Sequence, residues 1–475
     1  MRSSLTLILL SAGLLAFAVG CGVLSGSKSG RASTGLVQVW LTNPAQAERF
    51  AVQPSLRSGA IITADVPIIA IDEQQRFQTM DGFGYTLTGG SAMLLHKMTP
   101  EARAKLLREL FGVKDDAIGI SYLRLSIGAS DLDDRVFSYN DLPLGETDPT
   151  LARFSLAPDQ EHLIPVLKEI LAVSPDIKLL GSPWSPPTWM KTNANSKGGS
   201  LKPEWYDAYA RYFVKYVQGY AAEGIRIDAI TVQNEPLHPG NNPSLLMLAE
   251  QQATFIKSNL GPAFKAAKLD TKIIIYDHNA DKPEYPITVL NDPEARAYID
   301  GSAFHLYGGQ IEALSKVHAA YPDKHLYFTE QWVGSKTKFA DNFSWHIKNL
   351  VIGAPRNWAR TVLEWNLAAD SQQNPHTPGG CTECRGAITI DGDSVKREDA
   401  YYIIAHASKF VQPGSVRVAS TETTGLPNVA FRTPDGQLVI IVQNEGTEPK
   451  TFGIRRGQQT VTATLPPGAA ATYVW

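Results

Sequence analysis

Residues 227–235 read "IDAITVQNE", which is the pattern of a buried strand that ends in polar residues. This stretch decides the fold because similar segments recur along the chain. Apolar side chains predominate up to Val232, as in a buried strand, and Asn234, Glu235 and Pro236 follow at once. Seven other short apolar segments have a strand-like pattern, and they begin at Met80, Ile120, Ile177, Lys272, Ile299, His325 and Arg360. Longer amphipathic segments separate them. This alternation predicts a closed parallel (β/α)8 TIM barrel.

Two of the connecting segments carry clear helix signals. Residues 100–112, "PEARAKLLRELFG", have a proline in the first turn and a glycine just past the end. Residues 203–224 repeat Tyr, Phe and Trp at helical spacing, which indicates an aromatic face packed in a core rather than a binding surface. We therefore expect a helix in each segment.

The flanks of the predicted barrel have a different pattern. After about residue 411 the chain gives only short alternating runs separated by polar turns such as "PDGQ", which is typical of an antiparallel sandwich. Strand-like runs also begin at Val37 and Ile61. The sequence therefore predicts a barrel over residues 79–411 and a β-sandwich over residues 412–475, which the strands of residues 37–78 join.

The N-terminus predicts export. Residues 1–21 combine Arg2 with an apolar run too short to span a bilayer comfortably, and they end in "AVGC", small residues before Cys21. This pattern predicts a signal peptide and a lipidated Cys21, as in bacterial lipoproteins, with simple cleavage nearby as the alternative. Residues 22–36 are rich in Gly and Ser and predict a flexible tether. We expect a secreted, periplasmic or cell-surface protein that touches the membrane only through this anchor.

Charge and cysteine content narrow the function. The net charge of −3 gives no reason to expect a nucleic-acid partner. Cys381 and Cys384 remain after processing, and in an oxidising compartment a local disulfide is the favoured interpretation. A redox-active pair is the weaker alternative, and two cysteines without nearby His or Cys make a poor zinc site.

Acidic residues fall where the predicted strands reach the mouth of the barrel, the end at which such folds carry their chemistry. Glu235 and Glu330 stand out, because each ends an apolar run directly. A single glutamate there could equally be a salt-bridged structural residue, but two from separate strands that face one pocket are less easily explained in that way. The other candidates at this end are Asp131, Asp277 and Glu364.

Two carboxylates suit the cleavage of a glycosidic bond. One protonates the leaving oxygen while the other, ionised, stabilises or attacks the anomeric carbon. Aromatic rings that could stack on sugar C–H faces occur near the same strand ends, although a lone Trp in a barrel is more often packing. These residues, with two polar neighbours, are Trp184, Trp189, His305, Tyr307, Trp365 and Asn366.

A metal site is the less favoured interpretation of the histidines. His278 and His305 do not belong to a His-x-x-x-His pair, and hydrolysis by two carboxylates needs neither metal nor cofactor. Asp131, Asp133 and Asp134 form an acidic cluster that could be a solvated loop. Of these, we expect only Asp131, nearest the strand end, to bind a sugar hydroxyl.

In order and spacing, "GSPWSPPTWMKTN", "TVQNEP", "FHLY", "FTEQW" and "EWNLA" resemble the family 30 glycoside hydrolases, which include acid glucosylceramidase and bacterial β-1,6-glucanases. The resemblance covers nearly all of the chain after about residue 60. It implies a (β/α)8 barrel with an attached β-sandwich, and retention of configuration through a covalent glycosyl-enzyme. By position in these motifs, Glu235 is similar to the acid/base and Glu330 to the nucleophile.

The same resemblance implies a substrate-binding role for other residues. Asn234 would bind the sugar 2-hydroxyl, and Arg124 would support the catalytic carboxylates. The remaining residues would form the glucose pocket and the cleft: Asp131, Trp184, His305, Tyr307 and Trp365.

The resemblance leaves the substrate open, because "QQNPHTPGGCTECRGAITID" after the last barrel strand departs from the glucosylceramidase pattern. A β-linked glucan or glycolipid is the expected substrate, with a β-xyloside or β-fucoside as the alternative within the family. A non-catalytic carbohydrate-binding lipoprotein is the alternative from another class. Loss of one glutamate would be expected of a binder, and both are present.

Overall fold

The computed structural model describes residues 35–59 and 66–475. The predicted signal peptide, Cys21 and the predicted tether up to residue 34 lie outside the described residues. Within those residues, no helix is both long enough and apolar enough to cross a membrane.

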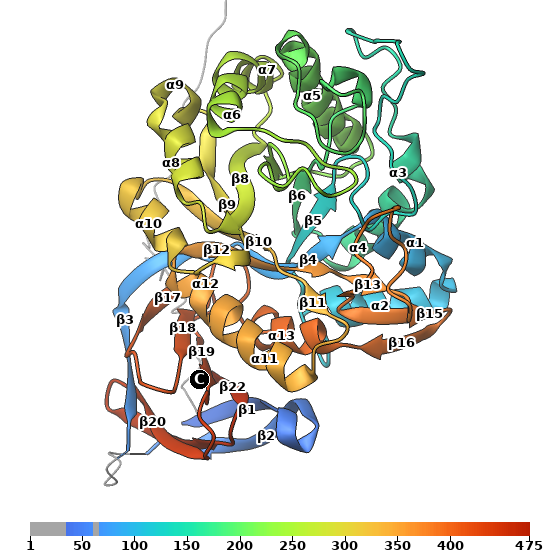
Figure 1. Cartoon of the computed structure of the whole chain (residues 1–475). Coiled ribbons are helices and arrows are strands. Elements are labelled where there is room, and N and C mark those ends of the chain that lie inside the picture. Colours follow the sequence, from blue (N-terminus) through green and yellow to red (C-terminus); the bar gives the residue numbers. More distant parts are fainter. Residues whose placement is uncertain (1–34, 60–65) are drawn as a thin grey trace, which may run out of the picture. The chain divides into compact units, whose positions relative to one another are not determined.

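Eight parallel strands close into a barrel in the order β4, β5, β6, β7, β8, β9, β10, β12, with β12 returning to β4 (Figure 1). All eight coincide with segments predicted from the sequence, so the barrel is confirmed. Their bounds are β4 Gly82–Leu87, β5 Tyr122–Ser126, β6 Lys178–Ser182, β7 Ala229–Thr231, β8 Lys272–Ala280, β9 Ile299–Gly309, β10 His325–Glu330 and β12 Ala359–Asn366.

Side chains fill the barrel interior. One buried cluster takes a residue from each of seven strands: Tyr122, Leu180, Ala229, Ile274, Ala303, Tyr327 and Leu363. Such a packed interior closes the barrel below its mouth. Polar groups at the ends of the strands are therefore supported by a tightly packed layer of side chains.

Both predicted helices are present. α2 covers Pro100–Phe111, and the Thr99 side chain caps its N-terminus. α5 covers Tyr206–Ala222 and buries its aromatic face. The other helices are α1 Gly89–Lys97, α3 Ala157–Glu161, α4 Leu163–Val173, α6 Ala249–Phe255, α7 Gly261–Ala266, α8 Glu284–Asn291, α9 Pro293–Arg296, α10 Ala313–Ala320, α11 Phe339–His346, α12 Ala354–Arg356 and α13 Asp399–Ser408.

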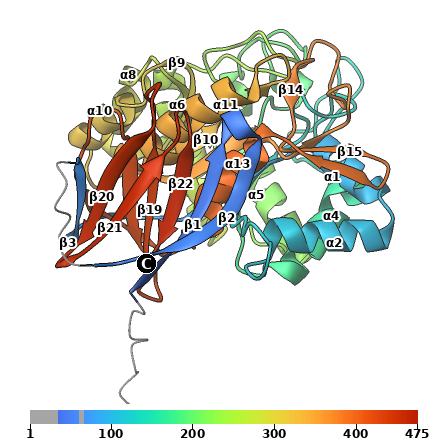
Figure 2. The same cartoon turned by 90° about the horizontal axis from the view of Figure 1, so that it is seen from below.

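Strands from both flanks form one sheet, in the order β2-β1-β22-β19-β18-β17-β3-β20-β21 (Figure 2). Phe452 on β20 packs edge to face on Tyr473 on β22, although four strands separate β20 and β22 in the sheet. The two halves of the sheet therefore face each other, as in a sandwich. The bounds are β1 Leu36–Asn43, β2 Glu48–Arg57, β3 Ile68–Thr79, β17 Val416–Ser420, β18 Asn428–Arg432, β19 Leu438–Gln443, β20 Lys450–Arg456, β21 Gln459–Leu465 and β22 Ala470–Val474.

Some strands were not predicted from the sequence. β2 lies at one edge of the sheet and contains Pro54, and its partly exposed residues lack the apolar alternation of a half-buried strand. Two small sheets lie beside the barrel. They are formed by β11 Val333–Gly334 with β14 Cys384–Arg385, and by β13 Ala368–Ala369 with β15 Ile388–Asp391 and β16 Ser394–Arg397.

A buried histidine joins the last barrel helix to the sandwich. His406 on α13 lies 2.9 Å from Thr472 through Nδ1 and 2.9 Å from Thr42 through Nε2. Burial lowers the pKa of His406 to about 3, so the imidazole is neutral. Trp40 on β1 also packs on Phe410, with ring centroids 4.4 Å apart.

Candidate active site

The chain leaves its strand before it reaches Glu235. β7 ends at Thr231, whereas the sequence predicted a strand up to residue 235. Beyond it, Asn234 N donates to Pro183 O at 2.8 Å and Glu235 N donates to Asp277 O at 3.0 Å. Glu235 adopts a left-handed φ of 44°, which is uncommon for a residue with a side chain and rarer still before proline. Neighbouring strand ends thus hold Glu235 in a strained backbone conformation, which is typical of functional positions.

Glu330 approaches the same point as the last residue of β10, which lies three strands from β7 around the barrel. One carboxylate oxygen of Glu235, one of Glu330 and a ring nitrogen of His305 all lie within 4.8 Å of one another. Both glutamates are largely buried, at 8% and 5% exposure. Such a short separation suits direct attack by one carboxylate on a sugar bound beside both.

Arg124 on β5 holds the two strand ends together. Its guanidinium is fully buried and donates to Glu330 Oε2 at 2.5 Å, to Asn234 Oδ1 at 2.6 Å and to Asp277 Oδ2 at 2.9 Å. Because Asn234 Oδ1 already accepts from Arg124, the N–H donors of the Asn234 amide are the groups that can serve other partners.

Asp277 also belongs to the site, although sequence reasoning noted only its place at a strand end and assigned it no role. Its carboxylate accepts from Arg124, from the Ser182, Thr231 and Thr329 hydroxyls, and from His305. Burial raises the pKa of Asp277, but Arg124 and His305 outweigh burial and hold the pKa well below its usual value. A fixed negative charge therefore lies under the mouth.

His305 lies between Asp277 and Glu235. Its Nε2 is 3.2 Å from Asp277 Oδ1 and its Nδ1 is 3.2 Å from Glu235 Oε1. Burial lowers the pKa of His305, but Glu330, Asp277 and Glu235 outweigh burial and raise it to about 9. An ionised Asp277 can only accept, so His305 Nε2 carries a proton. The second proton then lies either on Nδ1 or on Glu235.

The pKa values of the two glutamates shift in opposite directions. Burial raises the pKa of both carboxyls. At Glu235, the hydrogen bond and the charge of His305 outweigh burial and lower the pKa. At Glu330, burial outweighs the charges of His305 and Arg124, so the pKa is raised. If the pKa values alone decided the roles, Glu330, with the higher pKa, would be the acid. The hydrogen bonds point the other way, because Arg124 can only donate and holds Glu330 as an acceptor. The lowered pKa of Glu235 also depends on a protonated His305, so the ring beside Glu235 holds a proton that it can donate.

A cleft of about 290 Å³ opens over the glutamates. Trp184 and Trp365 stack in its wall, with ring centroids 5.3 Å apart. Tyr307 donates from its hydroxyl to Glu330 Oε1 at 3.0 Å. The other residues that line the cleft are Asp131, His238, Asn241, His278, Asn279, Trp332, Cys381 and Cys384.

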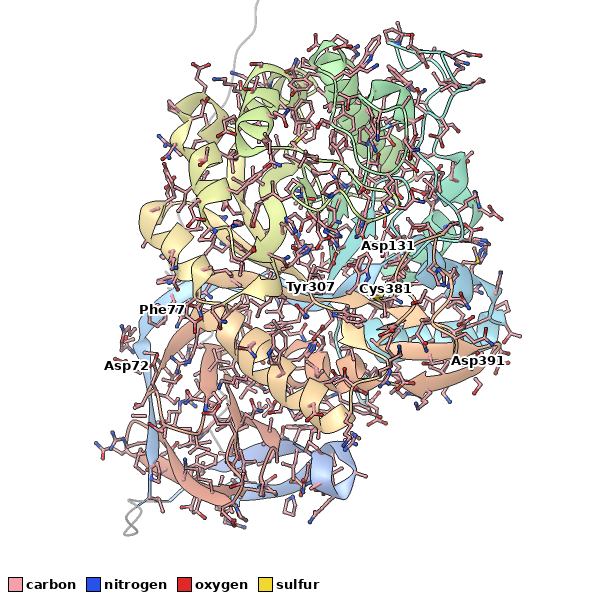
Figure 3. The ribbon with its side chains drawn as sticks, in the orientation of Figure 1. Asp72, Phe77, Asp131, Tyr307, Cys381 and Asp391 are labelled. Carbon is pink, nitrogen blue, oxygen red and sulfur yellow. A yellow bond between two sulfur atoms is a disulfide. The ribbon has the colours of Figure 1, made fainter. Side chains whose placement is uncertain are left out.

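Asp131 and the cysteines meet at one side of this cleft. Cys381 and Cys384 form a disulfide, and Cys381 N donates to Asp131 Oδ2 at 3.3 Å. Burial, with the charges of Glu330 and Glu235, raises the pKa of Asp131 to about 7. Figure 3 labels Asp131, Tyr307 and Cys381 near the centre of the molecule, away from Asp391 on β15.

Several residues noted in the sequence are structural instead. Trp189 Nε1 donates to Asn140, and its ring packs on Trp205. Asn366 accepts from Ser91 and Thr88, and Glu364 pairs with His346 at 2.7 Å.

Asp133 accepts from the backbone and hydroxyl of Ser130, and Asp134 pairs with Arg135. These side chains serve packing and loop geometry, and a strand-end position does not distinguish that role from catalysis.

Two close glutamates at the mouth of a parallel barrel, beside stacked indole rings, define the class of retaining glycoside hydrolases. The chain belongs to glycosyl hydrolase family 30, whose TIM-barrel domain matches residues 80–411 and whose beta sandwich domain matches residues 414–473. The predicted family, enzyme class and fold are thus confirmed.

Relatives of known activity are similar along most of their length. An endo-1,6-beta-D-glucanase from Neurospora crassa is 35% identical over 78% of this chain and 79% of its own. The lysosomal acid glucosylceramidase of Mus musculus is 32% identical over 86% of this chain and 83% of its own. A solved endo-beta1,6-glucanase is 35% identical with a TM-score of 0.85, over 93% of this chain and 99% of its own.

Proposed function

We propose that this enzyme hydrolyses β-1,6-linked glucan by double displacement, with Glu330 as the nucleophile and Glu235 as the acid/base. The observation that carries this proposal is the separation of the two glutamates, whose nearest carboxylate oxygens lie within 4.8 Å. In inverting enzymes the two carboxyl groups stand farther apart, since a water must fit between the sugar and the base.

In the first step, a Glu330 oxygen bonds to the anomeric carbon as the glycosidic C–O bond breaks. Glu235 gives its proton to the departing oxygen, so the leaving chain departs as a neutral alcohol. In the second step, Glu235 takes a proton from water, whose oxygen attacks the anomeric carbon and releases Glu330. Two inversions restore the β configuration.

The surroundings fit these roles. Arg124 and Tyr307 direct N–H and O–H groups at Glu330, which favours its ionised form. The Glu235 and His305 pair holds one shared proton next to the cleft. A substrate that excludes water disfavours a separated charge pair, so binding moves that proton to Glu235.

The sugar at the cleavage point is proposed to lie against Trp184 and Trp365. Indole rings bind the apolar faces of a pyranose, while carboxylates and amides bind its hydroxyls. Asn234 would donate from its amide to the 2-hydroxyl, and Asp131 would bind a hydroxyl farther from the bond. Tyr307 contacts Glu330 and the open cleft at once.

The β-1,6 linkage is favoured by the relatives. Endo-1,6-beta-D-glucanases from Neurospora crassa and Aspergillus fumigatus are 35% and 34% identical, and the solved endo-beta1,6-glucanase is 35% identical. The second candidate is glucosylceramide, which the 32% identity to the mouse enzyme supports. Structures of GH30 xylanases at 22% identity or less share the fold and carry no argument on substrate.

A substrate panel tests the proposal. The enzyme is incubated with linear β-1,6-, β-1,3- and β-1,4-glucans, glucosylceramide, and aryl β-glucoside and β-xyloside. We expect hydrolysis of β-1,6-glucan to exceed that of the other polymers and of glucosylceramide, with the β-anomer as the first product by NMR. An α-anomer would reject double displacement, and preference for glucosylceramide would select the second candidate.

The nucleophile is tested separately with a 2-deoxy-2-fluoro glucoside that carries a good leaving group. Mass spectrometry should find the sugar on the peptide that contains Glu330. A label on another residue would reassign the nucleophile. Variant Glu330→Gln serves as the control, because it should remain unlabelled.

We further propose that the enzyme is exported and anchored by a lipid on Cys21. The support is the charged and apolar start of the chain, the small residues before Cys21 and the Gly/Ser-rich stretch after it. Labelling with a fatty-acid analogue in a bacterial host tests this. Wild type should incorporate label and fractionate with membranes, Cys21→Ser should do neither, and unlabelled soluble wild type would favour simple cleavage.

A further inference from the structure

A second hollow of about 300 Å³ adjoins the catalytic cleft. Trp332 lines both, so the two share a wall. The far wall is α11, which lies next to β11 (Figure 1). We call this hollow the α11 groove; its lining includes Gln331, Trp332, Thr337, Asp341 and Trp345.

The groove presents groups suited to a sugar. Trp345 is 39% exposed, unusual for so large an apolar ring, and it lines the groove. Asp341 is one helical turn before Trp345, so both occupy the same face of α11. An indole ring with a carboxylate beside it can bind the C–H face and the hydroxyls of a pyranose.

Gln331 gives an independent sign of a ligand. It is 7% exposed, and its side-chain oxygen has no hydrogen-bond partner among the described residues. A buried acceptor without a partner costs free energy. A turn of the Gln331 side chain toward the groove would bring this oxygen to a ligand hydroxyl, which would supply the missing donor.

Gly334 leaves space in the groove because it has no side chain. A side-chain carbon at Gly334 would lie 3.2 Å from Thr337 Oγ1 and 3.6 Å from the Trp332 ring, between the two walls. Gly334 also pairs with Cys384 across β11 and β14, so the groove and the disulfide loop share one support. The floor of the groove is therefore formed by backbone that the pairing of β11 with β14 holds in place.

We propose that the α11 groove is a distal glucosyl subsite, which binds units of the substrate chain beyond those at the cleaved bond. The proposal rests on the proposed glucanase function. Trp332 lines both the cleft and the groove, so a glucan chain held at the glutamates and extended past Trp332 enters the groove. The occupant of the groove is therefore a further part of the same chain. A subsite of this kind favours attack within long chains.

Chain-length kinetics test the subsite. Hydrolysis of β-1,6-linked gluco-oligosaccharides of two to six units is compared in wild type, Trp345→Ala and Trp345→Phe, with an aryl β-glucoside beside them. For Trp345→Ala we expect kcat/KM to fall roughly fivefold on the longest chains, as the loss of one stacking platform predicts, and to stay unchanged on the aryl glucoside. Trp345→Phe should recover part of the loss. Lys338→Ala, an exposed change at the start of the same helix, is the control and should match wild type.

The outcomes separate this inference from the proposed function. If wild type leaves every β-1,6-linked oligosaccharide intact, the proposed function fails and the subsite fails with it. If wild type cleaves them and Trp345→Ala changes all lengths equally or none, only the subsite is rejected. A loss confined to glucosylceramide would likewise overturn it, since the groove would then hold lipid.

Discussion

His305 Nδ1 lies 3.2 Å from Glu235 Oε1, and this contact couples the two groups into one titrating pair. The other ring nitrogen is held by Asp277, so the pair exchanges its proton only on the side that faces the cleft. His305 Nδ1 lies farther from Glu330 Oε1, at 3.7 Å, and Glu330 accepts hydrogen bonds from Arg124 and Tyr307. These unequal contacts give the two close carboxylates different proton partners, as the proposed acid and nucleophile require.

Replacing His305 should shift the alkaline limb of the pH profile. The raised pKa of His305, about 9, means that the pair keeps its proton until the pH passes that value. In His305→Gln, Glu235 must hold the proton alone, and a carboxyl is less basic than this imidazole. We expect the upper limb of kcat/KM on a poor leaving group to move down by about one pH unit or more.

The control for this profile is His278→Gln. His278 lies 4.0 Å from Glu235, and burial lowers the pKa of His278 to about 4, so it is neutral across the range. Replacing His278 should leave the alkaline limb of the pH profile unchanged. An unmoved limb in His305→Gln would show that Glu235 titrates independently of His305.

Removing the Glu235 acid should harm substrates according to their leaving group. A glucan alcohol needs a proton to depart, whereas a nitrophenolate does not. Glu235→Gln should therefore slow β-1,6-glucan hydrolysis by about 10²-fold or more and the glycosylation of a dinitrophenyl glucoside far less. Pre-steady-state rates measure that step directly. Equal losses on both substrates would remove Glu235 from the acid role.

Opening the disulfide should weaken substrate binding. Cys381 N donates to Asp131, and both cysteines line the cleft beside the tryptophans. In the double variant Cys381→Ser with Cys384→Ser, we expect KM to rise roughly tenfold with a smaller change in kcat, because one hydrogen bond to a carboxylate is no longer held. A reductant should do the same to wild type and nothing to the double variant. An unchanged KM would make the disulfide a feature of stability alone.

The eight barrel strands could be predicted because each is a short apolar run and longer segments separate one run from the next. The two glutamates could be chosen because each directly follows such a run. No role could be predicted for Asp277, because its hydrogen-bond partners come from five other strands and no local pattern reveals them. The backbone turn at Glu235 was also missed, because Pro236 after a strand gives no sign of a left-handed residue.

Stability should reveal a buried carboxyl outside the active site, Asp159, which accepts from the Tyr139 and Tyr220 hydroxyls at 2.6 and 2.5 Å. Burial raises the pKa of Asp159 to about 7, against these two hydrogen bonds. Between its usual pKa and about 7, the folded state binds the proton more tightly than the unfolded state. Asp159 therefore lowers the free energy of unfolding as the pH rises through that window, by about 1 kcal/mol per pH unit.

Denaturation of Asp159→Asn and wild type at about pH 5 and about pH 8 checks this sign. The free energy of unfolding of the variant, relative to wild type, should be higher at the higher pH. Asp148→Asn is the matched control, because backbone and Asn140 hydrogen bonds hold the pKa of Asp148 at about 2, and both states are ionised throughout the range. Its difference from wild type should be the same at both pH values. A pH-independent difference for Asp159→Asn would mean that the two tyrosine hydroxyls keep Asp159 ionised in the folded enzyme.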